Sequence, residues 1–103
     1  MPETVKKLLQ AGADVGFSWD KTHTPLHLAV WGEYEEIVQI LLRHGADPSA
    51  QDSSGRTPLH VASLKGNLKC CEHLIKSGAD LTKKEFQGMT ALHMLVVEPA
   101  TVR

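Results

Sequence analysis

The feature that most constrains this fold is a six-residue motif that recurs every thirty-three residues. It reads TPLHLA at residues 24–29, TPLHVA at 57–62 and TALHML at 90–95. A second string, Gly-Ala-Asp, keeps the same interval at residues 12–14, 45–47 and 78–80. Two unrelated strings with one period indicate an internal repeat, which predicts a stack of equivalent units. The alternative, a compact bundle with coincidental self-similarity, does not readily produce identical motifs at a strict period.

Composition restricts the class of protein. The chain has 103 residues, of which 42% are hydrophobic, so it can bury a small core. A net charge of −1 gives no reason to expect nucleic acid or an acidic membrane surface as partner. No apolar run is long enough to span or insert into a bilayer, and the N-terminus lacks the apolar core of a signal peptide. Cys70 and Cys71 are adjacent and cannot link distant segments, which favours an intracellular location, the cytoplasm or nucleus.

Periodicity and end signals predict two short helices in each unit. A Thr-Pro pair starts the first helix, because proline at the first helical position gives up an N–H that is not needed there. The glycine of Gly-Ala-Asp ends the second helix. We expect second helices at residues 2–11 and 35–44 and before Gly78, and first helices starting at Thr24, Thr57 and Thr90. Helices this short cannot bury their apolar faces alone, but stacked copies can.

The second helices carry apolar positions that we expect to point inward. The inward sets are Ile37, Val38, Leu41 and Leu42 in one unit and Cys70, Cys71, Leu74 and Ile75 in the next. The loop after the first helix differs between these units, since Glu33 occupies the place of Gly66 and Gly32 precedes it. We therefore expect that loop to be shifted by one residue.

The period, the TPLH string and the Gly-Ala-Asp string together resemble ankyrin repeats, from about Glu3 to Val97. The resemblance implies an all-α solenoid of helix-turn-helix units joined by β-hairpin-like fingers. It also implies that the concave side, made of fingers and first helices, binds other proteins. We divide the single domain 1–103 into a half repeat at 1–18, repeats at 19–51 and 52–84, and an incomplete repeat at 85–103.

The incomplete outer units leave two interpretations open. The first, which we favour, is a segment of a longer regulatory or scaffold protein; the second is a complete small protein with irregular caps. The orphan second helix at 2–11 and the orphan first helix at 90–97 are complementary halves of one unit. Head-to-tail self-assembly is therefore the alternative function to partner binding.

The histidines and cysteines could in principle catalyse a reaction or bind a metal, but the sequence favours structural roles for them. The family resemblance implies that His27, His60 and His93 hydrogen-bond nearby backbone and threonine hydroxyl groups. No carboxylate or cysteine recurs with them at ligand spacing, so we expect no metal. Cys70 and Cys71 replace Ile37 and Val38, as small apolar core residues would. The chain shows no phosphate-binding loop or nucleophile set, and we expect no cofactor and no enzymatic activity.

The predicted binding residues occupy positions that vary between copies while the framework stays constant. In the family such positions face partners. They are the finger tips Asp20, Lys21, Ser53, Ser54, Phe86 and Gln87; the residues before each motif threonine, His23, Arg56 and Met89; and the ends of the first helices, Trp31, Leu64 and Val97, with Lys65 beside them.

The column of Trp31, Leu64 and Val97 is the most informative of these. If the units stack in register, the three side chains would form an apolar ridge on a face that is otherwise expected to be polar and solvent-exposed. Such a ridge is typical of an interaction site. The competing interpretation is that Trp31 folds over its neighbour and that Val97 is covered by a further segment.

Overall fold

The computed structural model describes residues 2–12 and 23–97, with side chains as far as residue 94. These ranges contain six helices and no β-strand. The helices are α1 Pro2–Gln10, α2 Pro25–Trp31, α3 Glu35–Arg43, α4 Pro58–Lys65, α5 Leu68–Lys76 and α6 Ala91–Val97. The all-α repeat fold is confirmed, whereas the hairpin-like form of the fingers and the repeat boundaries stay predictions.

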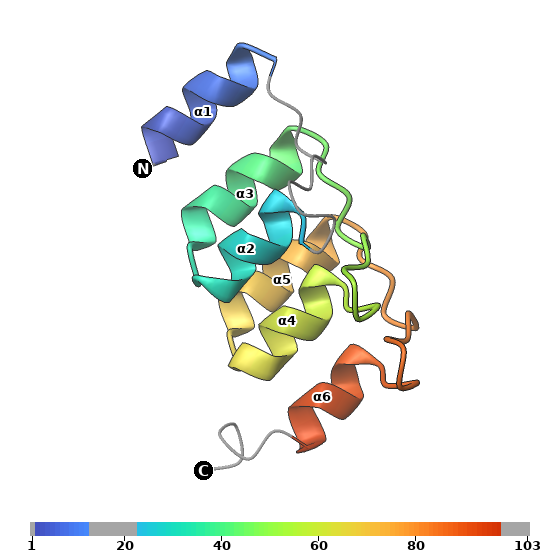
Figure 1. Cartoon of the computed structure of the whole chain (residues 1–103). Coiled ribbons are helices and arrows are strands. Elements are labelled where there is room, and N and C mark those ends of the chain that lie inside the picture. The colour runs from blue at the N-terminus through green and yellow to red at the C-terminus, as the bar shows by residue number, and fades with distance from the viewer. Residues whose placement is uncertain (1, 13–22, 98–103) are drawn as a thin grey trace.

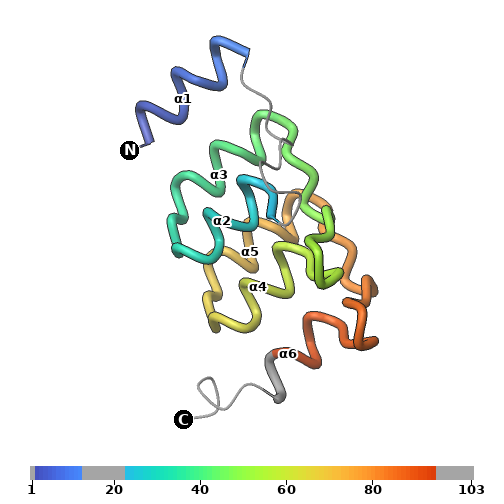
Figure 2. The backbone as a smooth tube through the Cα atoms, viewed as in Figure 1, coloured from blue at the N-terminus to red at the C-terminus, as the bar shows by residue number. Residues whose placement is uncertain are grey.

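The helices form two rows (Figure 1). One row holds α1, α3 and α5, with α3 packed against both of its neighbours. The other row holds α2, α4 and α6, with α4 in the middle. Within a unit, α2 packs on α3 and α4 on α5. Segments 44–57 and 77–90, which connect successive units, run along the same side of the stack (Figure 2).

Each first helix begins at its motif threonine. Thr57 has an extended backbone, and its hydroxyl oxygen accepts a hydrogen bond from the His60 N–H. In return, the imidazole Nδ1 of His60 accepts from the Thr57 N–H at 3.0 Å. Thr24 and His27 make the same reciprocal pair. Two backbone donors that the helix cannot satisfy are thus satisfied locally at each start.

The same histidines connect one unit to the next. The Nε2 of His27 lies 2.8 Å from the carbonyl oxygen of Arg56, and the Nε2 of His60 lies 2.8 Å from that of Met89. Because Nδ1 accepts a backbone N–H, each ring is neutral and donates from Nε2. Both rings are buried. The predicted structural role of these two histidines is confirmed.

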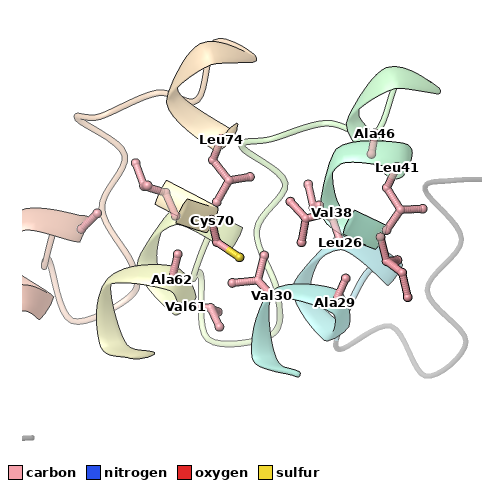
Figure 3. Close-up of a cluster of buried hydrophobic side chains, with 13 residues drawn as sticks. Leu26, Ala29, Val30, Val38, Leu41, Ala46, Val61, Ala62, Cys70 and Leu74 are labelled. Atoms are coloured by element: carbon pink, nitrogen blue, oxygen red, sulfur yellow. The ribbon is translucent and has the colours of Figure 1, made fainter. Parts of the chain in front are cut away.

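The core is a continuous layer between units. Figure 3 shows Cys70 and Leu74 of α5 directed toward Val30 of α2 and Val38 of α3. All four side chains are fully buried. Burial raises the pKa of the Cys70 thiol to about 11, so it remains protonated and packs as a small apolar group.

The inward set of α5 was predicted only in part. Cys70 and Leu74 are buried and Cys71 is half-buried, but Ile75 is 49% exposed. The equivalent Leu42 in α3 is partly buried against the core, because α5 packs beside α3. Among the described residues no second helix lies beyond α5, so the prediction that Ile75 is buried was wrong.

We expect Thr57→Val to lower the free energy of unfolding by about 1–2 kcal/mol, because it removes the hydroxyl acceptor while keeping the shape. Thr57→Ser is the matched control, since it keeps the hydroxyl, and it should lose clearly less. Urea denaturation of the three proteins measures both effects. Equal losses in the two variants would contradict a capping role.

Stability should also fall in mild acid because of His27. Burial lowers the pKa of its imidazole below the ordinary value of 6.5. The unfolded chain therefore binds a proton that the folded chain resists, and the stabilising effect of the neutral ring is lost as pH falls below about 6.5. The free-energy difference between wild type and His27→Gln should shrink between about pH 7.5 and pH 5.5. A difference independent of pH would show that His27 is not the group responsible.

Candidate protein-binding face

An acidic residue organises each described connecting turn. Asp52 Oδ1 accepts from the N–H groups of Ser54, at 2.8 Å, and Arg56, at 2.9 Å. In the next unit Glu85 Oε1 accepts from the N–H groups of Gln87, at 2.7 Å, and Met89, at 2.9 Å. The carboxylate thus replaces water as acceptor for the turn backbone and leaves the tip side chains outside.

Sequence reasoning did not assign a role to Asp52 or Glu85. The available signal was an acidic residue three positions before the glycine of each turn, Gly55 and Gly88. Trp19 and Thr22 occupy the corresponding positions of the first unit, so its sequence lacks both the acid and the glycine.

The two described turns lie against each other. The Phe86 N–H donates to the Ser54 carbonyl at 3.0 Å. The Gln51 side-chain amide donates to the carbonyl oxygens of Gly55 and Lys84. Gly55 has a φ of +79°, and a Cβ there would collide with the Phe86 ring. The structure therefore brings together four predicted tip residues, which are all exposed: Ser53, Ser54, Phe86 and Gln87. Asp20 and Lys21 lie outside the described residues.

The residues before each motif threonine are half-buried and take part in the fold. The carbonyl groups of Arg56 and Met89 accept the histidine hydrogen bonds. His23 Nε2 lies 3.8 Å from Asp52 Oδ2, and its ring packs edge-on to that of His27. The Arg56 Nε is buried without a hydrogen-bond partner among the described residues. This column offers a partner less side-chain surface than the turn tips do.

The ends of the first helices form a compact cluster. Trp31 is 40% exposed, and Lys65 Nζ lies 5.3 Å from the centroid of its ring, in a cation–π contact. Leu64, which precedes Lys65, is half-buried. Trp31 therefore contacts the next unit through Lys65 but keeps part of its ring accessible. The Val97 side chain lies outside the described residues.

The loop beside this cluster is not shifted, contrary to our expectation. Glu33 has a φ of 59° and Gly66 a φ of 66°, so both take the left-handed conformation at equivalent positions. Their hydrogen bonds also match, since Tyr34 N–H donates to Ala29 and Asn67 N–H donates to Ala62. The two loops share one backbone path, which in this unit places a glutamate in a conformation that favours glycine.

The Gly-Ala-Asp strings end helices and start turns. Asp47 Oδ1 accepts from the Ser49 N–H, and Asp80 Oδ1 accepts from both the N–H and the hydroxyl of Thr82. The Thr82 hydroxyl and amide lower the pKa of Asp80. Both carboxylates are thus engaged locally and lie in different units. Within the described ranges, no three histidine, cysteine or acidic side chains gather as metal ligands would.

A known protein family matches almost the whole chain. The family model described as "Ankyrin repeats (3 copies)" matches residues 1–85 and, overlapping them, residues 51–98. No curated protein matches the chain. In residues 2–12 and 23–97, every helix is too short or too polar to cross a membrane.

Replacing Glu33 by glycine should raise the free energy of unfolding by about 0.5–1 kcal/mol, because it removes the cost of a left-handed side-chain-bearing residue. The contact of Glu33 with Lys65, at 3.7 Å on the surface, contributes little. Glu33→Ala is the control, since it removes the carboxylate but keeps the unfavourable φ. Thermal and urea denaturation should rank the glycine variant above wild type and the alanine variant at or below it. A glycine variant less stable than wild type would contradict this interpretation.

Proposed function

Since this chain belongs to the ankyrin-repeat family, whose repeats are generally protein–protein interaction modules, we propose that it binds a protein partner through its turn tips and first helices. The partner would lie along a surface made of the tips Ser53, Ser54, Phe86 and Gln87 and the cluster Trp31, Leu64 and Lys65. Asp20, Lys21, His23, Arg56, Met89 and Val97 complete this proposed surface.

The observation that carries the proposal is the exposure of the Trp31 ring and its contact with Lys65. The ring is partly exposed, and the cation–π contact with Lys65 favours one position of the ring, which reduces the side-chain entropy that binding costs. Tryptophan is one of the residue types that most often dominate interface energies. Phe86 adds a second exposed aromatic ring, 74% accessible, seated on Gly55.

The difference between buried, repeated positions and exposed, variable positions supports the same binding surface. Side chains that hold the fold, such as Thr57 and His60, are buried and repeated between units. Tip residues differ in every unit and make their hydrogen bonds through the backbone. Their side chains can therefore be chosen for a partner without disturbing the turns.

The repeats belong to a family of interaction modules and not of enzymes. We propose that this chain likewise has no catalytic activity of its own and needs no cofactor. The free thiols Cys70 and Cys71 support a reducing compartment, the cytoplasm or nucleus. A near-neutral net charge supports a protein rather than a nucleic acid as ligand.

Trp31→Ala should weaken partner binding at least tenfold, and Leu64→Ala should weaken it less, because its side chain is half-buried. Quantitative affinity capture from cell lysate, followed by titration of the captured protein, measures the effect. Glu36→Ala on α3, exposed and outside the proposed surface, is the control. If Trp31→Ala keeps its helical circular dichroism and captures the same proteins with the same affinity, this surface is not the binding site.

A further inference from the structure

Arg56 is a charged side chain that the fold leaves without a counter-charge. Its Nε is buried without a hydrogen-bond partner, and among the described residues no carboxylate forms an ion pair with its guanidinium. A buried donor without an acceptor costs free energy, and most such groups in native proteins are satisfied. Arg43, the other described arginine, is exposed and therefore solvated. Arg56 thus keeps a capacity for binding an anion that the chain itself does not use.

The backbone of Arg56 is fixed on both sides. Its N–H donates to Asp52 Oδ1 at 2.9 Å, and its carbonyl accepts from His27 Nε2 at 2.8 Å. The side chain is half-buried as a whole, and within the described part of the chain Nε is its only nitrogen that is both enclosed and without a partner. The terminal nitrogens are therefore open to a ligand. Because burial already restricts the stem of the side chain, a ligand that binds these nitrogens orders few further bonds.

The acidic residues of the two described turns are directed inward and do not neutralise Arg56. Asp52 and Glu85 each accept two backbone N–H groups of their own turn. The Asp52 side chain and Glu85 are each only 5% exposed. The second oxygen of Asp52, Oδ2, faces the imidazole of His23 at 3.8 Å. The negative charges of these turns are thus used by the fold and are hidden from a partner.

Basic side chains, by contrast, lie on the outer side of the turns and first helices. Lys84 is exposed in the second turn, and Lys65 is exposed at the end of α4. Together with Arg56 they give this side three cations. In the turns 51–57 and 84–90, the first helices and the loop after α2, the only exposed acid is Glu33, which contacts Lys65 at 3.7 Å. This side therefore carries a positive field.

The other side of the stack has no such excess. Helix α3 carries two acidic residues and one basic residue, and α5 carries one acidic residue and two basic ones, so that the two helices balance. The tip of the first unit, outside the described residues, contributes one charge of each sign in Asp20 and Lys21 and leaves the difference unchanged. The positive field thus belongs to the turns and first helices.

We propose that the partner presents an acidic peptide segment, whose aspartate or glutamate side chain binds Arg56. This inference rests on the protein-binding surface proposed above and adds the chemistry of its ligand. The carboxylate accepts parallel hydrogen bonds from the terminal nitrogens of the guanidinium and supplies the missing counter-charge. Apolar side chains beside that carboxylate contact the exposed rings of Trp31 and Phe86. A nucleic acid would need more phosphate contacts than three cations provide.

Selection from three displayed libraries of random peptides, about twelve residues long, tests the proposal on the whole chain. The libraries share leucine, phenylalanine, serine and glycine, and they differ only in a further pair: aspartate and glutamate, asparagine and glutamine, or lysine and arginine. We expect the acidic library to be retained at least about tenfold better than the amide library, because only carboxylates pair with the guanidinium. Raising the salt concentration from about 50 mM to about 500 mM should reduce this preference.

Variants of Arg56 separate binding from folding. Arg56→Met keeps a long side chain but removes the unpaired donor, so the variant should keep its circular dichroism and be at least as stable as wild type in urea. It should nevertheless lose the preference for acidic peptides. Arg56→Lys keeps the charge without the planar fork and should retain part of the preference. Lys76→Met, which removes an exposed cation from α5, is the matched control and should retain all of it.

The outcomes distinguish this inference from the proposed function. Equal retention of the three libraries, retention of none, or an acidic preference that survives Arg56→Met overturns the acidic partner. If the chain prefers amide or basic peptides and Trp31→Ala releases them, the binding surface stands and the acidic partner falls. If acidic peptides depend on Arg56 but remain bound to Trp31→Ala, the acidic site stands and the wider surface through Trp31 falls.

Discussion

The buried imidazole between consecutive units is the interaction on which the structure depends. His60 accepts a backbone N–H with one ring nitrogen and donates to the next turn with the other, so its neutral tautomer is required by both contacts. Water cannot replace either partner at a site that is almost completely buried. One side chain thus joins the start of a helix, the turn of the next unit and the spacing between them. The short helices are ordered because these connections repeat.

Helix starts and helix ends could be predicted from the sequence, because each depends on a local signal that recurs in every unit. Thr24, Thr57 and their following prolines define where first helices begin, and Gly45 and Gly78 follow the ends of second helices. The sequence-based expectations failed where the outcome depends on neighbours or on backbone shared between units. Ile75 has the pattern of a core residue and is exposed because no described helix covers it. Glu33 adopts a glycine-like conformation because its loop follows the same backbone path, with the same hydrogen bond back to the first helix, as the loop that contains Gly66.

The candidate binding surface was predictable to a similar extent. Variation between copies identified the tip positions, and the structure shows Ser54 and Phe86 side by side. The contact of Lys65 with Trp31 could not be read from spacing, because it depends on how far α4 is displaced from α2. The carboxylates of Asp52 and Glu85 were missed because one is an aspartate and the other a glutamate, although each accepts the same two backbone groups.

The limited packing of α1 affects the order in which the helices unfold. No residue of this helix is fully buried, and its main packing partner is α3. By contrast, α4 contacts three helices and buries six of its eight residues. Detaching α1 therefore costs far less free energy than opening the middle of the stack. We therefore expect α1 to open before the middle of the stack, so its amide protons should exchange with solvent long before those of α4.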